Sequence, residues 1–370
     1  MRKKILFLMS CMHAGGAERV ASILSNAWVS HGDEVILAIT VFNRGECFYP
    51  LLPGVRLIYI ADLVGNKDRT WLNSLNRLYA VRRLIIKEHP DVIVSFLHFV
   101  NVAAVIASIG LKIPTIICER NDPFAMSIPW WERFQCRLTY PLADALMVQT
   151  QALATQYASS GLTLRRLRII PNPISEHMMN IQHQTNDKAI KRLLGVGRLW
   201  DQKQFCVLIK IFASLAKRYA DWSLRIVGQG YLHAALQKQI IDLGLEKRIE
   251  LVGQKENIEK ELAEADAFVL TSKHEGFPNV LLEAMAAGLP CVTFDCPSGP
   301  REISMDGQMA LLVPLNDEHS LGVALERIMS DAGLRESLGK RAKSSVIERY
   351  ALDKILEQWN SLFREVGVKF

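Results

Sequence analysis

The chain is organised around one stretch, which reads HEGFPNVLLEAMAAGLP from His274 to Pro290. It joins an apolar strand, Ala267 to Leu270, to a short helix. Pro278 suits the first helical position, because its missing N–H would be unpaired there anyway. Gly288 ends the helix, and Pro290 prevents it from resuming. The pattern therefore predicts a strand, a glycine-containing loop and a helix in immediate succession.

The opening of this helix is a candidate ligand site. Backbone N–H groups lie beside Gly276, where no side chain blocks approach, and such an end attracts phosphate. Glu275 and Glu283 bracket it and can accept hydrogen bonds from hydroxyl groups. A nucleotide sugar, with phosphate between two hydroxyl-bearing rings, has that layout. The alternative is a pair of solvated glutamates on a surface helix, because short motifs often match by chance.

Strand-like apolar runs alternate with helical patterns along the whole chain. Near-continuous apolar strands alternating with helices predict parallel sheets covered on both faces. Two such series in 370 residues predict two doubly wound domains. The polar segment Ser175–Lys188 is the expected linker. The stretch from Tyr350 to Val366 is expected to be a helix with Ile355, Trp359 and Phe363 on one face.

The formal charge of +6 is concentrated in the first half of the chain. Residues 1–180 hold 19 Lys and Arg against 13 Asp and Glu, whereas the remainder holds 25 of each. The first half is therefore expected to meet an anionic partner: a membrane surface, a phosphorylated acceptor or nucleic acid. Nucleic acid is disfavoured, because no nucleic-acid motif is present. The seven cysteines form no CxxC pair, which argues for a reducing cytoplasm and against a zinc site. We expect no signal peptide and no spanning helix, because no apolar run approaches about 20 residues.

Several candidate residues of the first half follow predicted strands, where ligands bind in such sheets. Gly15 and Gly16 can approach a diphosphate, although a plain tight turn explains them equally well. They do not form the G-x-G-x-x-G fingerprint of nicotinamide binding. His98 is a candidate base or hydroxyl ligand, with a structural histidine as the alternative. Glu119 and Arg120 have two interpretations: they pair with each other, or they are functional if both face the cleft, since a surface pair alone stabilises little.

The segment after these residues has the composition of a membrane-surface element. Trp130 and Trp131 stand close to Arg133 and Arg137, which is typical of a helix at the lipid interface. Leu72–Lys87 adds four cations to an apolar face, although an ordinary amphipathic helix explains it as well. Together with the charge asymmetry, this favours membrane-surface binding by the first half.

The second half carries glycines and charges at the ends of its strands. Arg198 and Lys203 stand five residues apart after the first strand and can bind phosphate. Gly197 precedes them, and Gly228 and Gly230 end the next strand. Unrelated loops would not all converge at one sheet edge, so the set indicates a binding site.

The order of these motifs resembles that of the retaining glycosyltransferases of GT-B fold in family four. The resemblance rests on six stretches: GGAER at 15–19, PNPI at 171–174, GVGRL at 195–199 with Gln202 and Lys203, GQG at 228–230, Glu275 with Glu283, and SGPRE at 298–302. It implies two Rossmann-like doubly wound domains facing across a cleft. Residues 1–174, with a C-terminal helix 350–370 that crosses back, would bind the acceptor. Residues 189–349 would bind the nucleotide sugar.

The resemblance also implies roles for individual residues. Arg198, Lys203 and Glu275 would be the catalytic residues, with the two cations on the donor diphosphate and Glu275 on the sugar hydroxyls. Glu283 would bind the ribose. The remaining donor-binding candidates are Gly15, Gly16, Gly197, Gly228, Gly230, Gly276, Phe277, Asn279 and Val280. No metal or other cofactor is expected, because two cations can replace a metal's electrostatic work. Retention by front-face displacement is expected.

One departure narrows the expected acceptor. Many family members have a histidine where this chain has Glu119-Arg120-Asn121. The loop is similar to that of bacterial members that extend undecaprenyl-diphosphate-linked glycans with N-acetylhexosamines. This similarity favours a lipid-linked acceptor, with His98, Glu119 and Arg120 as candidate acceptor residues. It makes UDP-N-acetylgalactosamine the first donor to test. The expected setting is lipopolysaccharide or O-antigen assembly by a peripheral enzyme on the inner face of the plasma membrane. The alternatives are an enzyme similar to UDP-N-acetylglucosamine 2-epimerases and a non-catalytic nucleotide-sugar-binding protein.

Overall fold

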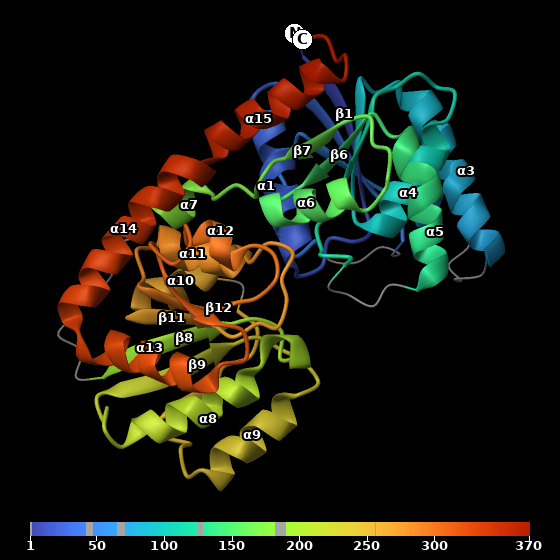
Figure 1. Cartoon of the computed structure of the whole chain (residues 1–370). Helices are drawn as coiled ribbons and strands as arrows, with labels where there is room; N and C mark the ends of the chain where they lie inside the picture. Colours follow the sequence, from blue (N-terminus) through green and yellow to red (C-terminus); the bar gives the residue numbers. More distant parts are fainter. Residues whose placement is uncertain (1, 42–46, 65–70, 125–128, 182–189, 256) are drawn as a thin grey trace. The chain divides into compact units, whose positions relative to one another are not determined.

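The computed structural model describes residues 2–370 except 42–46, 65–70, 125–128, 182–189 and 256. Of residues 71–73 it describes the backbone alone. The chain divides into two compact units (Figure 1). Unit 1 contains Met1–Pro173 with Asp353–Phe370, and unit 2 contains Ile174–Leu352. Each unit is built on its own parallel sheet.

Unit 1 contains a seven-stranded sheet in the order β3-β2-β1-β4-β5-β6-β7. Every neighbouring pair is parallel, and β1 and β4 are the neighbours at which the strand order reverses. The central strands are buried on both faces, because their sequences are almost continuously apolar. The strands are β1 (Lys4–Met9), β2 (Glu34–Ile39), β3 (Val55–Tyr59), β4 (Val92–Phe96), β5 (Thr115–Cys118), β6 (Ala145–Val148) and β7 (Leu167–Ile169).

Helices cover the sheet of unit 1. Those formed from the N-terminal part are α1 (Gly16–Ser30), α2 (Ile60–Val64), α3 (Trp71–Glu88), α4 (His98–Ser108), α5 (Trp130–Thr139), η1 (Tyr140–Leu142) and α6 (Gln151–Ser159). Helices α3 and α4 pack side by side on the strands, and α5 packs beside α4 (Figure 1). The C-terminal helix α15 (Leu352–Glu365) packs Trp359 edge-on against Trp28 of α1, with ring centroids 5.6 Å apart. The expected return of the chain's end to the first domain is therefore observed.

Unit 2 contains a six-stranded sheet in the order β10-β9-β8-β11-β12-β13, again entirely parallel. Its strands are β8 (Lys191–Val196), β9 (Trp222–Val227), β10 (Ile249–Leu251), β11 (Ala267–Leu270), β12 (Cys291–Asp295) and β13 (Leu311–Pro314). Its helices are α7 (Glu176–Met179), η2 (Asp201–Lys203), α8 (Phe205–Ala216), α9 (His233–Asp242), α10 (Ile258–Glu264), α11 (Asn279–Ala286), α12 (Pro300–Ile303), α13 (Glu318–Ser330) and α14 (Ala332–Tyr350). The two predicted doubly wound α/β sheets are confirmed.

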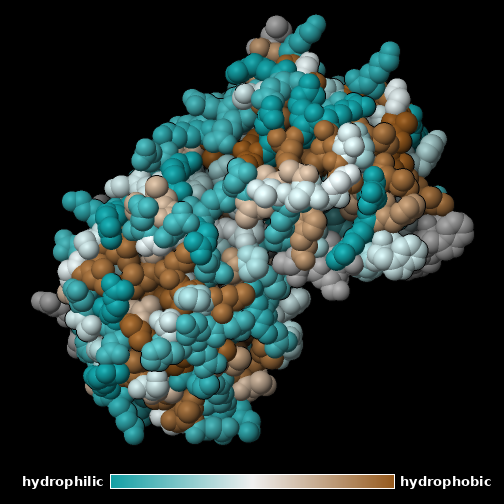
Figure 2. Space-filling view, in the orientation of Figure 1, coloured by the Kyte–Doolittle hydropathy of each residue, from teal (hydrophilic) through white to brown (hydrophobic). Residues whose placement is uncertain are grey.

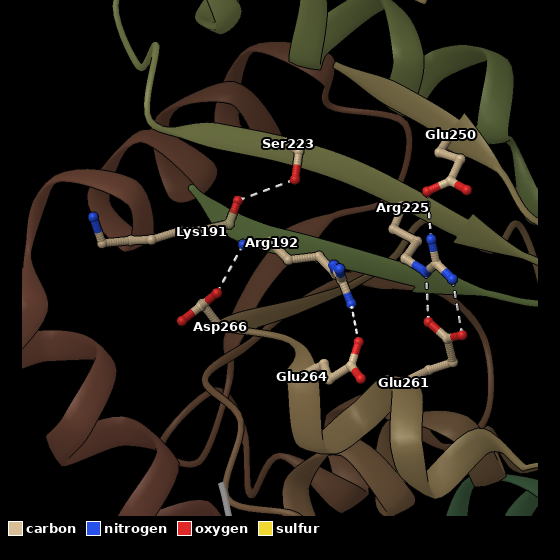
Figure 3. Close-up of polar contacts among 8 residues, drawn as sticks. All are labelled: Lys191, Arg192, Ser223, Arg225, Glu250, Glu261, Glu264 and Asp266. Atoms are coloured by element: carbon tan, nitrogen blue, oxygen red, sulfur yellow. Dashed lines mark hydrogen bonds and ion pairs between the residues drawn. The ribbon is translucent and has the colours of Figure 1, made fainter. Parts of the chain in front are cut away.

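Ion pairs attach helix α10 to the strands that it covers (Figure 3). Arg225 of β9 binds both carboxylate oxygens of Glu261, at 2.6 and 3.1 Å, and also pairs with Glu250. Arg192 of β8 pairs with Glu264 at 2.7 Å. These cations meet carboxylates already, so the cluster holds the sheet together and offers no vacant charge to a ligand.

The structure corrects several boundaries predicted from the sequence. Helix α11 begins at Asn279, so Pro278 is the residue before the helix rather than its first residue. The polar segment Ser175–Lys188 is not simply a linker, because Glu176–Met179 forms α7 and Met178 is buried in the core of unit 2. Residues 182–188 of that segment lie outside the described residues. The expected C-terminal helix Tyr350–Val366 is observed as α15, which begins at Leu352 and ends at Glu365, because Tyr350 is the last residue of α14.

Candidate functional site

Two predicted site residues meet at the reversal point of the second sheet. Strands β8 and β11 are neighbours there, and ligands of open α/β sheets bind beyond the carboxyl ends of such strands. Lys203 follows β8 and Glu275 follows β11. The Nζ atom of Lys203 lies 2.5 Å from Oε1 of Glu275, and their side chains are 12% and 11% exposed. The sequence separation of 72 residues is therefore closed by the topology of the sheet.

Three hydrogen bonds fix the loop of Lys203 against the loop of Glu275. The side-chain amide of Gln202 donates to the carbonyl of His274 at 2.7 Å. The main-chain N–H of Lys273 donates to the carbonyl of Gln202 at 2.8 Å. The hydroxyl of Thr271 donates to the carbonyl of Lys203 at 2.7 Å. The ion pair is therefore held by main-chain contacts on both sides, which is the preorganisation that a binding site requires.

Glycines allow the loop after β8 to approach its neighbours closely. A Cβ atom on Gly228 would lie 1.9 Å from the carbonyl oxygen of Gly197, and one on Gly230 would lie 2.4 Å from that of Leu199. A Cβ on Gly197 would meet the side chain of Lys203 at 2.9 Å. The missing side chains thus let β9 close on the loop and leave room for Lys203. Among the predicted donor-binding glycines, the structure gives these three a packing role.

The loop before α11 is supported from the neighbouring strand. Ser298, which follows β12, donates its hydroxyl proton to the carbonyl of Gly276 at 2.9 Å. Gly299, with φ of +101°, packs where a Cβ would lie 2.4 Å from the ring of Pro278. The main chain at Gly276 is therefore braced beside the Lys203–Glu275 pair. Ser298 and Gly299 matched the family pattern, but their supporting contacts could not be read from the sequence.

The residues of α11 differ in what they offer to a ligand. The ring of Phe277 is buried and lies 6.0 Å from that of Tyr350, so only its main chain remains for a donor. Asn279 and Val280 are partly exposed at the opening of the helix. Glu283 lies one turn further along and is 4% exposed. The N–H of Asn279 donates to the carbonyl of Phe277 at 2.9 Å, so it is not a vacant donor at the opening of α11. The opening has a carboxylate on either side, Glu275 before it and Glu283 within the helix.

Arg198 lies beside this site on an aromatic support. Its guanidinium carbon is 4.4 Å from the ring centroid of Trp200, and that ring packs against Tyr231 at 5.9 Å. The hydroxyl of Tyr231 donates to Asp201. Stacking on an aromatic face orients a guanidinium without neutralising it, so Arg198 keeps its charge for a ligand. The part played by Tyr231 was missed from the sequence, because it comes from a loop 30 residues later.

The chemistry available at this edge of the sheet is anion binding beside hydroxyl binding. An ammonium group has three donors, so Lys203 can hold Glu275 and a phosphate oxygen together. Glu275 can accept hydrogen bonds from sugar hydroxyls. No group of three or more His, Cys, Asp or Glu within the described ranges could hold a metal ion. The site residues that the structure brings together are therefore Lys203, Glu275 and the opening of α11.

The candidate acceptor residues of unit 1 are mostly buried and do not pair with one another. Glu119 is 2% exposed and accepts hydrogen bonds from the hydroxyl of Tyr140 and, at 3.4 Å, from the amide of Asn101. Burial raises the pKa of Glu119 to about 7, although these hydrogen bonds oppose the shift. The suggested pairing of Glu119 with Arg120 is wrong, because each side chain has its own partners.

Arg120 is a buried cation with neutral partners. Its Nη1 donates to Oδ1 of Asn172 at 2.6 Å, and Gln149 donates to the same oxygen at 2.7 Å. The guanidinium lies 3.4 Å from the ring centroid of Phe96. Its Nε and Nη2 atoms are buried and have no hydrogen-bond partner among the described residues. Burial lowers the pKa of Arg120 to about 10, which is the effect expected when a charge is desolvated without a counter-ion.

His98 and the glycine pair have structural surroundings. Nε2 of His98 lies 2.7 Å from a carboxylate oxygen of Glu132, so this contact joins α4 to α5. Gly15 precedes α1 and accepts the N–H of Arg19 at 3.0 Å. A Cβ on Gly15 would lie 2.2 Å from a carboxylate oxygen of Glu18. A side chain at position 15 would therefore require the carboxylate of Glu18 to move.

Most of the chain matches two models of glycosyltransferase domains. A model of the "Glycosyltransferase Family 4" domain matches residues 14–177, and one of "Glycosyl transferases group 1" matches residues 180–345. No helix in the described part of the chain is long and apolar enough to cross a membrane.

Curated relatives from Campylobacter jejuni match over most of the chain. A GalNAc-α-(1→4)-GalNAc-α-(1→3)-diNAcBac-PP-undecaprenol α-1,4-N-acetyl-D-galactosaminyltransferase is 28% identical over 98% of this chain and 99% of its own. An N-acetylgalactosamine-N,N'-diacetylbacillosaminyl-diphospho-undecaprenol 4-α-N-acetylgalactosaminyltransferase is 31% identical over 70% of this chain and 72% of its own. Among solved structures, Anabaena HepE in complex with UDP superposes with a TM-score of 0.82 at 19% identity, covering 98% of this chain and 99% of that one.

Proposed function

This chain belongs to glycosyltransferase family 4, with the GT-B fold, and we propose that it transfers N-acetylgalactosamine from UDP-N-acetylgalactosamine to a glycan on undecaprenyl diphosphate. The observation that carries the proposal is the Lys203–Glu275 pair at the reversal point of the second sheet. It sets a cation and a hydroxyl acceptor beside a helix opening, which suits a nucleotide sugar. The activities for which both Campylobacter relatives are named support the choice of N-acetylgalactosamine and of undecaprenyl diphosphate.

We assign the donor contacts in unit 2 by their chemistry. Lys203 and Arg198 bind the diphosphate, because both keep donors free for phosphate oxygens. Glu275 accepts hydrogen bonds from the sugar hydroxyls, and Glu283 accepts them from the ribose. The main-chain N–H groups after Gly276 add neutral donors. Gly15 and Gly16 remain predicted contacts of the diphosphate.

The proposed reaction proceeds with retention at the anomeric carbon. The bond from that carbon to the diphosphate breaks, and a bond to the acceptor oxygen forms on the same face. The acceptor proton passes to the departing phosphate oxygen. Lys203 and Arg198 stabilise the charge that develops on this phosphate, which is the role of a metal in metal-dependent enzymes. No metal or other cofactor enters the proposed mechanism.

For the acceptor, we propose that Arg120 binds an anionic group. A buried guanidinium with two unpartnered nitrogen atoms is unfavourable unless an anion or water reaches it. Glu119 and His98 act on the shape of this region through Tyr140 and Glu132, rather than through proton transfer. A lipid-linked acceptor places the enzyme peripherally on the inner face of the plasma membrane, in lipopolysaccharide or O-antigen assembly.

The two alternatives from the sequence have less support. Both family models describe glycosyltransferases, and they cover 14–177 and 180–345. An activity like that of UDP-N-acetylglucosamine 2-epimerases requires no lipid acceptor. A non-catalytic binding protein would tolerate the loss of Glu275 or Lys203, and this chain retains both.

The donor and acceptor can be tested together. The purified protein is incubated with single nucleotide sugars and native lipid extract, and products are identified by mass spectrometry. We expect a lipid-linked product heavier by one N-acetylhexosamine with UDP-N-acetylgalactosamine alone. Transfer from another nucleotide sugar contradicts the donor, and epimerisation without transfer contradicts the reaction.

The stereochemistry needs its own measurement. The anomeric proton of the transferred sugar is observed by NMR. Its signal reports the configuration set by the enzyme, since a glycoside does not mutarotate. We expect an α-linked product from the α-linked donor. A β-linked product, or a covalent glycosyl-enzyme trapped during turnover, contradicts the proposed displacement.

A further inference from the structure

Helix α5 is built with its apolar side facing outward. Trp130, Trp131, Phe134 and Leu138 are 78%, 48%, 55% and 58% exposed. At 3.6 residues per turn they fall within an arc of about 100°. The other side of the helix carries the buried Thr139, with half-buried Glu132 and Cys136. An ordinary surface helix has the opposite arrangement, with its apolar stripe against the core.

The outward arc of α5 is edged by cations and carries no carboxylate. Arg133 and Arg137 are exposed next to it, one turn apart. Glu132 is the one acidic residue of the helix, and it turns to the opposite side, where it meets His98 at 2.7 Å. The exposed surface of α5 therefore combines large apolar groups with positive charge alone.

The neighbouring helices extend this surface. Exposed apolar side chains continue on α4 and α3, and Figure 2 shows hydrophobic residues gathered over the region of α4 and α5. They are Phe99 and Ile106 of α4, and Leu75, Tyr79 and Ile86 of α3. We call these five residues, with the four of α5, the α3–α5 face.

Helices α3, α4 and α5 together carry an excess of positive charge, as α5 does alone. Their sequences contain six Lys and Arg against two glutamates. The second glutamate, Glu88, is buried and pairs with Lys4 at 3.0 Å and with Arg56. Neither glutamate therefore weakens the positive charge at the surface.

We propose that the α3–α5 face docks on a lipid bilayer, with α5 lying in the plane of the interface. Phe134 and Leu138 enter the boundary of the acyl chains, Trp130 and Trp131 lie at headgroup depth, and Arg133 and Arg137 meet anionic headgroups. A bilayer is the occupant that the chemistry favours, because its apolar layer matches the large exposed side chains and its phosphates match the cations beside them. This inference rests on the proposed function, which requires an acceptor anchored in the membrane. It adds the part of the chain that contacts the membrane, the α3–α5 face.

The position of α5 in the fold gives docking a consequence. Strand β5 leads through Glu119 and Arg120 to α5, whose first residue is Trp130. In a parallel sheet the helix after a strand begins at the carboxyl edge of that sheet and runs back across it. The tryptophan end of α5 therefore lies on the same edge as Arg120. A lipid-linked acceptor held in the bilayer then presents its diphosphate to the edge at which the candidate acceptor residues lie.

Vesicle binding by the whole protein tests this inference. Phe134→Ser with Leu138→Ser is compared with Ile241→Ser with Leu243→Ser in unit 2. Ile241 lies in the last turn of α9 and Leu243 directly after it, and they are 53% and 44% exposed. The vesicles contain phosphatidylcholine with or without phosphatidylglycerol, and neither donor nor acceptor is present. We expect the α5 pair to weaken binding on the order of tenfold or more, since two apolar side chains no longer leave water. The α9 pair should bind like the parent, with circular dichroism checking the fold of both.

A second pair of substitutions separates charge from insertion. Arg133→Glu with Arg137→Glu should lose the preference for phosphatidylglycerol and most of the salt dependence. Equal binding by the parent and the α5 serine pair overturns the proposal. Dimerisation that the serine pair abolishes, without vesicle binding by the parent, assigns the face to a second copy instead. Because these measurements contain no substrate, a wrong donor or reaction leaves their result unchanged.

Discussion

The two units have sheets of the same winding, but they treat charge at their strand ends in opposite ways. In unit 2, Lys203 and Glu275 form a partly accessible ion pair at the reversal point of the sheet. In unit 1, Glu119 and Arg120 are 2% and 6% exposed, stand next to each other in sequence, and take neutral partners separately. A shared fold therefore fixes where a site can lie, whereas the pairing of side chains decides what it can bind.

The outer surfaces differ as well. Three neighbouring helices of unit 1 expose large apolar residues, with Trp130 the most exposed among them. In unit 2, exposed apolar residues such as Ile241 and Val323 lie on separate helices. Single apolar residues on a surface are normal, whereas a continuous group indicates an interaction site. The comparison thus supports the proposals that unit 2 binds a small polar ligand and that unit 1 docks on a surface.

The largest expected effect is on the ion pair of unit 2. Lys203→Ala should lower kcat by about 10²–10³-fold, because a donor to the departing phosphate is lost in the transition state. Binding of free nucleoside should change far less. Steady-state kinetics with UDP-N-acetylgalactosamine, together with calorimetry with uridine, measures the two effects. Comparable losses in both would contradict a transition-state role.

A matched control lies at the start of β8, the strand that precedes Lys203. Lys191 of β8 forms an ion pair with Asp221 at 2.7 Å, as short as a typical charged hydrogen bond. Lys191→Ala should leave kcat within about twofold, because exposed pairs contribute little. A large kcat loss in this variant would show that the effect on kcat is not specific to the position of Lys203.

A smaller effect is expected from the backbone that supports the pair. Gly228→Ala should destabilise unit 2 by about 3 kcal/mol, because the new methyl group would displace the carbonyl of Gly197. Hydrogen exchange of peptides from β8 and β9 reports the loss within this unit. Gly333→Ala in α14 is the control, since its Cβ would make only an ordinary 3.4 Å contact. Equal protection in both variants would show that the close approach is not required.

The comparison also explains what could be predicted from the sequence. The parallel sheets followed from apolar runs such as Ile5–Met9, and Lys203 and Glu275 could be chosen because they follow strands. Their contact with each other could not be predicted, because it depends on hydrogen bonds from Gln202 and Thr271 to main-chain carbonyls. Spacing carries no information about such contacts.

In unit 1 the errors have the same origin. The adjacency of Glu119 and Arg120 suggested a pair, but successive residues after a strand point in opposite directions and find different partners. The partners Tyr140 and Asn172 lie 21 and 52 residues away. The exposed side of α5 was indicated by composition, yet its orientation required the packing of Glu132 and Thr139 to be known.

The buried carboxyl group of unit 1 predicts a pH dependence. Burial raises the pKa of Glu119 from its ordinary 4.5 to about 7, so the folded state keeps a proton that the unfolded chain releases. Stability should therefore fall as the pH rises from about 4.5 to 7, by on the order of 2 kcal/mol. Glu119→Gln should remove this dependence, because an amide does not titrate, and the amide oxygen can still accept from Tyr140. Hydrogen exchange of β5 and α4 peptides at pH 5 and 8, as approximate limits, measures it. A Gln variant with the parent's pH dependence would assign the titration to another group.

The smallest effect is expected at His98 of unit 1, whose partner in the structure is the carboxylate of Glu132. His98→Gln keeps a donor for Glu132 and should change kcat/KM by less than about threefold, if the histidine only joins α4 to α5. His98→Ala removes the contact and should cost about 0.5–1 kcal/mol of local stability in hydrogen exchange of α5, with a similarly modest kinetic change. A general base would behave differently, because both substitutions would then lower kcat by about 10²–10⁴-fold and abolish the acidic limb of the pH–rate profile, where activity falls as the base takes up a proton. The pair of variants thus determines whether unit 1 contributes a proton acceptor or only the shape of the acceptor site, and a loss in the Ala variant alone supports shape.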